Sequence, residues 1–286
     1  MKVKNLTLHD NAYPSVLREI ADPPKKLFVA GEQFDALFSR PRVTIIGSRK
    51  VSAYGKAVTA QLAGELARAG VIIISGLAIG IDSLAHKAAL EAGAPTIAVL
   101  PSSIEEVYPR SHYQLAQQIV EQGGALVSEY PMGTPIYKTN FIARNRIASG
   151  LADAVLIIEA AQKSGTLHTA RFALEQGKEV LAVPGNITSP NSEGTNNLIK
   201  AGATPVTTAD DVLRVLGIEP AAAKVIVTSS NPHEQILLEL LQGGTSDGAE
   251  LLARSQLEVS IFNQTLTMLE ITGVIRPLGN NHWALA

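Results

Sequence analysis

From residue 43 onward, the chain alternates short runs of β-branched and aliphatic residues with longer amphipathic stretches rich in alanine, leucine, glutamate and glutamine. Each short run is apolar throughout, which is typical of strands buried on both faces of a parallel sheet. The amphipathic stretches are long enough to return the chain, as helices, to the start of the next parallel strand. The pattern therefore predicts an α/β fold with a mostly parallel sheet and helices on both faces.

The boundaries of these elements follow from the apolar runs and from the glycines that end each amphipathic stretch. The predicted strands are 43–46, 71–74, 96–100, 125–128, 154–158 and 179–183. The predicted helices of this region include 57–69, 83–92, 113–122 and 166–176. The sequence leaves the order of the strands in the sheet open.

The length of 286 residues corresponds to about two domains. We predict a lead-in over residues 1–40, the sheet domain over 41–217, a linker over 218–230 and a small domain over 231–286. In the small domain, helices are expected at 233–242, 248–254 and 260–271, followed by strands at 274–276 and 282–285. Three helices and a hairpin predict a C-terminal winged helix.

A winged helix commonly binds DNA, but the charge of this one argues against that role. Residues 231–286 carry two basic and six acidic side chains, a net charge of −4. No lysine or arginine lies between Arg254 and Arg276, so the third helix lacks cations for phosphate contacts. The composition favours a protein-contact or regulatory role for this domain.

Composition excludes several other classes of protein. The chain has no cysteine, which removes disulfides, thiol nucleophiles and cysteine-ligated metals, and its six histidines show no metal-ligand spacing. We therefore expect no metal and no cofactor. No signal peptide and no bilayer-spanning run is present, so a cytoplasmic protein is expected. A net charge of −2 means that any affinity for nucleic acid must be local.

Four loops that follow predicted strands are rich in glycine and small polar residues: 47–50, 75–82, 164–166 and 184–186. The carboxyl ends of parallel strands meet at one edge of a sheet, where such loops and the cations Arg49 and Lys50 favour phosphate. Taken singly, each loop can equally be a tight turn. Neither G-x-G-x-x-G nor a P-loop motif occurs, so neither common nucleotide fingerprint has support.

The densest cationic segment, Lys138 to Arg146, surrounds an aromatic ring with three cations. Cations neutralise phosphates, the phenylalanine at 141 offers a face for stacking a base, and asparagine can hydrogen-bond a base edge. This mixture is typical of single-stranded nucleic acid binding. The alternative is a solvated helix start with Phe141 in the core.

The hypothesis of an enzyme depends on Asp82 and His86, which lie four residues apart on a predicted helix and could form an acid–base pair. No partnered nucleophile accompanies them, since neither Ser75 nor Ser128 lies in a G-x-S-x-G elbow. We expect instead that Asp82 braces its loop and that His86 makes a structural hydrogen bond.

Seven short motifs occur together in a fixed order. They are Gly47-Ser48-Arg49, Ser75-Gly76-Leu77-Ala78-x-Gly80-Ile81-Asp82-x-x-Ala85-His86, Tyr108-Pro109, Ser128-Glu129-Tyr130-Pro131, Phe141-x-x-Arg144-Asn145-Arg146-Ile147, Ser164-Gly165-Thr166-x-x-Thr169-Ala170 and Pro184-Gly185. In this order and spacing the chain resembles the bacterial DNA-processing family DprA, also called Smf, over about residues 13–206.

The resemblance implies an extended Rossmann-like fold that binds and protects single-stranded DNA and loads the RecA recombinase during natural transformation and recombination, without catalytic turnover. It also implies a homodimer formed through the sheet domain. The DNA-binding residues that it implies are Arg49, Lys138, Phe141, Arg144 and Asn145, with Gly47, Ser48, Arg146 and Gly165 as further candidates.

Two features depart from that family. One alternative function remains, besides a pure interaction scaffold, which predicts neither DNA binding nor turnover. Many members begin with a helical SAM-like domain, for which the forty residues before the predicted sheet are too short, and Ile79 stands where arginine is frequent. The alternative is a nucleotide-processing phosphoribohydrolase-like enzyme of the LOG type, suggested by Ser164-Gly165-Thr166. The chain lacks the P-G-G-x-G-T run usual in that family.

Overall fold

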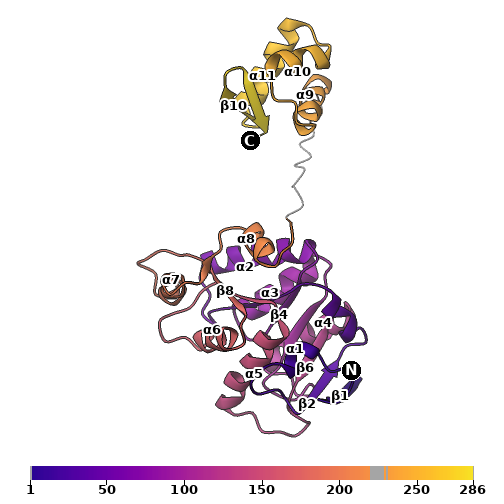
Figure 1. Cartoon of the computed structure of the whole chain (residues 1–286), viewed down its shortest axis with the longest axis vertical. Coiled ribbons are helices and arrows are strands. Elements are labelled where there is room, and N and C mark those ends of the chain that lie inside the picture. Colours follow the sequence, from indigo (N-terminus) through magenta and orange to yellow (C-terminus); the bar gives the residue numbers. More distant parts are fainter. Residues whose placement is uncertain (1, 220–228, 230, 286) are drawn as a thin grey trace. The chain divides into compact units, whose positions relative to one another are not determined.

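The computed structural model describes residues 2–219, 229 and 231–285. It divides the chain into two compact units, Met1–Pro220 and Ala221–Ala286 (Figure 1). The boundary between them falls inside the predicted linker 218–230, most of which lies outside the described residues.

A nine-stranded sheet organises the first unit, in the order β1-β2-β6-β5-β4-β3-β7-β8-β9. Its strands are β1 (Val3–Thr7), β2 (Lys26–Ala30), β3 (Arg42–Ile46), β4 (Ile72–Ser75), β5 (Thr96–Val99), β6 (Ala125–Ser128), β7 (Ala154–Ile157), β8 (Glu179–Ala182) and β9 (Thr204–Pro205). Neighbouring strands are parallel throughout the part β6-β5-β4-β3-β7-β8-β9 of this order. At one edge, β1 pairs antiparallel with β2, and β2 pairs antiparallel with β6. The mostly parallel sheet predicted from the sequence is therefore confirmed.

Residues 1–40 depart from the prediction of a lead-in that precedes the sheet. They supply β1 and β2, and β2 pairs with β6, so the sheet begins at Val3 and not near residue 41. The physical reason is apolar burial. Leu27 and Val29 point from β2 into the same core that Tyr13 and Leu17 fill, and all four side chains are almost fully buried.

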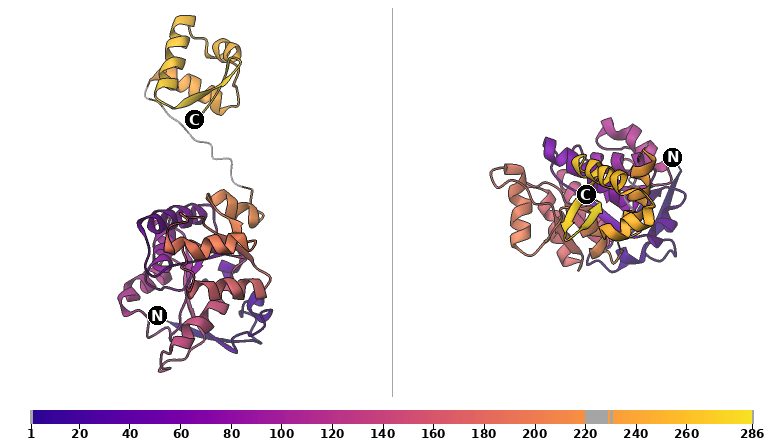
Figure 2. Two further views of the ribbon diagram at one scale, coloured as in Figure 1. Left: turned by 90° about the vertical axis from the view of Figure 1, so that its left-hand side faces the viewer. Right: turned by 90° about the horizontal axis from the view of Figure 1, so that it is seen from above.

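Helices cover both faces of the sheet, as predicted (Figures 1 and 2). The helical elements are α1 (Ser15–Arg18), η1 (Phe34–Ser39), α2 (Ala53–Arg68), α3 (Ile81–Glu91), η2 (Arg110–His112), α4 (Tyr113–Glu121), α5 (Lys138–Leu151), α6 (Thr166–Glu175), η3 (Pro190–Ser192), α7 (Glu193–Lys200) and α8 (Ala209–Val215). Successive residues of a strand point to opposite faces of the sheet and pack against different helices. Ile73 packs with α2, α3 and α8, while Ile72 and Ile74 pack with α1 and α5.

The second unit contains α9 (Pro232–Gln242), α10 (Gly248–Ser255) and α11 (Val259–Ile271), then β10 (Ile275–Gly279) paired antiparallel with β11 (His282–Leu285). Its core joins Leu237, Leu251, Phe262 and Ile275 from all three helices and the hairpin. The elements agree with those expected from the sequence, and the winged-helix assignment stays a prediction. No helix in the described part of the chain is both long and apolar enough to cross a membrane.

One buried polar group in the first unit is His86 on α3, whose side chain is fully inaccessible to solvent. Its Nδ1 lies 2.8 Å from the hydroxyl of Thr96, and that hydroxyl donates to the carbonyl of Ile73. The hydroxyl proton is thus already committed, so Nδ1 is the donor to Thr96. Burial, with a smaller contribution from the charge of Arg144, lowers the pKa of His86 to about 3.

This depressed pKa predicts a loss of stability in mild acid. In the unfolded chain the imidazole has an ordinary pKa near 6.5 and is protonated in mild acid, whereas in the folded chain it stays neutral. The stability that the neutral form provides above about pH 6.5 is therefore lost as the pH falls toward 3. Between about pH 7 and pH 5, we expect the free energy of unfolding to drop by about 2 kcal/mol more in the unaltered chain than in His86→Gln. Urea unfolding at both pH values measures this difference.

His9→Gln is the matched control, because His9 is exposed. It should keep the pH dependence of the unaltered chain. An equal drop in the unaltered chain and in His86→Gln would contradict the assignment.

Candidate functional site

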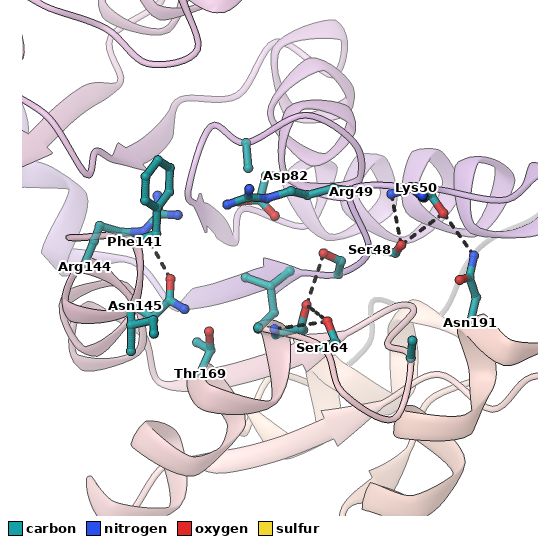
Figure 3. Close-up of a pocket in the computed structure, with 17 residues that line it drawn as sticks. Ser48, Arg49, Lys50, Asp82, Phe141, Arg144, Asn145, Ser164, Thr169 and Asn191 are labelled. Carbon is teal, nitrogen blue, oxygen red and sulfur yellow. Dashed lines mark hydrogen bonds between the residues drawn. The ribbon is translucent and has the colours of Figure 1, made fainter. Parts of the chain in front are cut away.

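The order of strands reverses between β3 and β7, because the chain builds β4, β5 and β6 on one side of β3 before returning to its other side. In open parallel sheets, ligands bind beyond the carboxyl ends of the strands at such a reversal. A cavity of about 480 Å³ lies there, lined by the loops after β3, β4 and β7, by α5 and by η3 (Figure 3). We call it the central cavity.

Two glycines let the loops after β3 and β4 pack directly on each other. A Cβ on Gly47 would lie 2.6 Å from the side chain of Ile81, and one on Gly80 would lie 2.3 Å from the carbonyl oxygen of Ser48. Gly80 also has a φ of 97°, a region that other residues rarely adopt. The close approach is completed by the N–H of Ile81, which donates to the Ser48 carbonyl. The residue types at these turns therefore fix the wall of the cavity.

The loop after β3 presents two exposed cations, Arg49 and Lys50. The Ser48 hydroxyl accepts from the N–H of Lys50 at 3.1 Å and donates to its carbonyl at 3.0 Å, and Asn191 on η3 donates to the same carbonyl at 3.0 Å. These bonds hold the backbone of the loop. In residues 2–219 neither cation forms an ion pair, so both charges remain available to an anionic ligand.

Arg49 lies over an aromatic ring at the other end of the cavity. Its guanidinium carbon is 5.2 Å from the centroid of the Phe141 ring, and Tyr108 meets that ring edge-on at 5.4 Å between centroids. Phe141 is half-buried and lines the cavity from the first turn of α5. Phe141 therefore lies at the cavity and not in the core, which was the alternative left open by the sequence. Arg49 thus makes a cation–π contact with the ring of Phe141.

Arg144, one turn further along α5, is buried and performs a different task. It donates to the carbonyls of Gly76 and Val99, at the ends of β4 and β5, and its Nε donates to Asn145 at 3.2 Å. Asp82 is buried nearby and accepts from the N–H of Gly76 at 3.1 Å. Burial raises the pKa of Asp82, while the charge of Arg144 acts in the opposite direction. Arg144 thus holds the loops and brings buried positive charge to the cavity wall.

The side of the cavity that faces β7 is made of small polar residues at the start of α6. The Ser164 hydroxyl accepts from the N–H of Thr166 at 3.2 Å, and the Thr166 hydroxyl donates to the Gly47 carbonyl at 3.2 Å. A Cβ on Gly165 would meet nothing within 4 Å, so this turn opens onto free space. The N-terminus of a helix, with its N–H groups directed outward, favours an anion at this position.

Seven of the nine predicted site residues line the central cavity, and two do not. The seven are Gly47, Ser48, Arg49, Phe141, Arg144, Asn145 and Gly165. Lys138 is exposed at the first residue of α5 and lies outside the lining. Arg146 is buried on the other side of α5, where it pairs with both oxygens of Glu129, at 2.8 and 2.7 Å, and with Asp22. These two carboxylates compensate the charge of Arg146, which argues against a ligand contact at this residue.

The cavity also contains residues that the prediction omitted. Lys50, Ser164 and Thr166 stood in loops that the sequence marked as phosphate-friendly, so a signal for them existed. No sequence signal pointed to Asn191, because it lies on η3, 141 residues beyond Lys50 in the chain. Only tertiary structure brings it to the site.

The candidate acid–base pair of Asp82 and His86 is not formed. Asp82, which also lines the central cavity, accepts from the backbone N–H of Gly76 and so braces its loop as expected, and His86 makes the expected structural hydrogen bond, to Thr96. Among the described residues, no group of three or more His, Asp or Glu side chains could hold a metal ion.

Curated relatives share the sheet unit with this chain. Protein Smf of Escherichia coli (strain K12) is 50% identical over 204 residues, which cover 71% of this chain and 54% of that protein. DNA processing protein DprA of Bacillus subtilis (strain 168) is 40% identical over 215 residues, covering 75% of this chain and 71% of that protein. The match to the first of these relatives thus spans about half of its length.

Solved structures agree with this relationship. DNA processing protein A from Streptococcus pneumoniae superposes with a TM-score of 0.70 at 38% identity, covering 75% of this chain and 74% of that one. DNA processing protein A from Helicobacter pylori, described for its single-stranded DNA binding mode, gives a TM-score of 0.67 at 34% identity and covers 76% and 96%. The resemblance to the DprA (Smf) family and the Rossmann-like fold of the sheet unit are confirmed. Residues 4–217 match the model of DNA recombination-mediator protein A, and the chain belongs to that family.

Proposed function

We propose that this DNA-processing protein binds single-stranded DNA in the central cavity and acts by holding the strand, without chemical turnover. The observation that carries the proposal is the Arg49 guanidinium over the Phe141 ring, at the edge of a cavity rich in small polar residues. The relative from Helicobacter pylori supports it, since that protein is described as binding single-stranded DNA.

Backbone phosphates are expected at the cationic side of the cavity. Arg49 and Lys50 supply free positive charge, and the open turn at Gly165 presents the N-terminus of α6. Lys138, exposed at the start of α5, would meet the strand where it leaves the cavity. Each contact of this kind releases counterions from the DNA, so binding weakens as salt increases.

A base is expected on Phe141, with Asn145 one turn further along the helix available to its edge. Stacking requires an exposed base face, which duplex DNA hides within its own stack. The proposal therefore predicts a preference for the single strand. Arg144 acts mainly as a positioning residue, because its Nη1 donates to the carbonyls of Gly76 and Val99 and its Nε to Asn145.

Replacing Arg49 by alanine tests this site. We expect weaker binding to labelled single-stranded DNA in fluorescence anisotropy and a salt slope reduced by roughly 0.7, the value for one lost phosphate contact on a single strand. Arg214→Ala is the control, because Arg214 is exposed, lies on α8 and lines no part of the cavity. Unchanged affinity and slope in Arg49→Ala, or equal binding of duplex and single strand by the unaltered chain, would refute the assignment.

The phosphoribohydrolase alternative has a direct test. Incubation of the unaltered chain with nucleoside monophosphates should release no free base, since Asp82 and His86 are both engaged in structural bonds. Chromatography of the products measures the outcome. Release of base above the level of a heat-denatured sample would favour the enzyme.

Family membership also leads us to propose a cytoplasmic homodimer that loads RecA onto single-stranded DNA during natural transformation and recombination. Light scattering should then give a mass twice the 30.2 kDa of one chain. RecA should be retained by the immobilised chain in the presence of single-stranded DNA and not by a matrix without it. A monomeric mass would refute the dimer, and failure to retain RecA would refute the partnership.

A further inference from the structure

A second cavity adjoins the central one beyond Lys50. It measures about 300 Å³, close to the lower limit for small-ligand sites, and we call it the side cavity. Its polar lining comes from Ser52, Tyr54, Glu159, Asn186, Ser189 and Ser192. Asn191 and Lys50 of the central cavity are joined by a hydrogen bond, and the side cavity is lined by their near neighbours in sequence, Ser192 and Ser52. This hydrogen bond between Asn191 and Lys50 is drawn at the right of Figure 3.

Tyr54 gives the side cavity a fixed aromatic wall. Its hydroxyl donates to the carbonyl of Pro184 at 2.8 Å, which ties the start of α2 to the loop after β8. The hydroxyl is therefore satisfied within the protein, yet 47% of the residue remains exposed. A ring that is held in place and left uncovered is suited to stacking, because little side-chain freedom is lost on binding. Ile187 in the same loop is 92% exposed and adds apolar surface nearby.

Glu159 gives the side cavity a negative wall. Only 1% of the residue is exposed, and its carboxylate accepts from the N–H of Ser52 at 3.1 Å and from the Ser52 hydroxyl. A Cβ on Gly55 would lie 2.4 Å from the carboxylate, so the group is packed tightly against the first turn of α2. A fixed carboxylate repels phosphate, which separates the side cavity from the cationic central one.

Uncommitted hydrogen-bonding groups complete the lining. The side-chain oxygen of Asn186 accepts from Thr188, but within residues 2–219 its amide nitrogen and the hydroxyl of Ser189 make no hydrogen bond. Such groups match the edge of a nucleobase, which is uncharged and carries both donors and acceptors.

We propose that the side cavity binds a second base of the same DNA strand, stacked on Tyr54, while the intervening phosphates lie on Arg49 and Lys50. The inference rests on the proposed function of the central cavity. It adds a site at which the ligand contact is a base and not a phosphate. The strand would run from Phe141 across the loop after β3 to the turn at Asn186.

Photocrosslinking and affinity together test the side cavity. Iodouracil-substituted single-stranded DNA should crosslink to Tyr54 as well as to the region of Phe141, as located by mass spectrometry. In anisotropy with oligothymidylate, Tyr54→Ala should bind roughly 5- to 150-fold more weakly, the range for loss of one base–aromatic stack. Tyr54→Phe should lose much less affinity than Tyr54→Ala, because it keeps the ring and loses only the hydroxyl that holds it to Pro184.

Tyr113→Ala is a matched control, since Tyr113 is equally exposed, on α4, and lines neither cavity. Its binding should be unchanged. No crosslink to Tyr54 in a chain that binds DNA, unchanged affinity in Tyr54→Ala, or a loss in Tyr54→Phe as large as in Tyr54→Ala would each overturn the side cavity alone. If Phe141→Ala and Tyr54→Ala both leave binding unchanged, the proposed function of the central cavity falls with it.

Discussion

The buried guanidinium of Arg144 is the group on which the architecture of the site depends. It occupies the space above the ends of β4 and β5, where it donates to the carbonyls of Gly76 and Val99. A Cβ on Gly76 would lie 2.2 Å from the guanidinium, so residue 76 must be glycine for this contact to exist. Burial lowers the pKa of Arg144, and the nearby carboxylate of Asp82 opposes that effect. The conformation of the loop after β4 therefore depends on the guanidinium of Arg144, which projects from α5.

That arrangement explains why cations so close in sequence have different tasks. A helix turns by about 100° per residue, so Lys138, Phe141 and Asn145 fall within about 60° of one another around α5, whereas Arg146 lies about 140° from Phe141. There Glu129 and Asp22 compensate Arg146, which joins α5 to the segment before β2. Arg144, about 160° from Arg146 around the helix, donates to the backbone carbonyls of Gly76 and Val99. The charge left for a ligand comes mainly from the loop after β3, which Gly47 and Gly80 hold against the loop after β4.

Much of this organisation could be predicted from the sequence, and the reasons are local. The apolar runs specified the parallel strands, and their ends specified which loops would meet, because parallel strands share a carboxyl edge. The strands β1 and β2 were missed, since they are partly exposed and pair antiparallel outside the alternating pattern. The separation of Arg146 from Phe141 was available from helical periodicity once the start of α5 was known. Asn191 and the pairing of Glu159 with Ser52 were not, because each joins segments more than a hundred residues apart.

The distribution of charge also bears on how a chain with a net charge of −2 could hold a polyanion. A protein with a slightly negative net charge gains little from long-range attraction to DNA, so its affinity must come from a few placed cations and from stacking. The central cavity has this composition, with Arg49 beside Phe141 and small polar groups from α6. Glu159, fixed beside Tyr54, limits the region in which phosphate is favoured. Alternating cationic and aromatic contacts would then set the register of the strand, since a phosphate and a base cannot exchange places along such a groove without losing both kinds of contact.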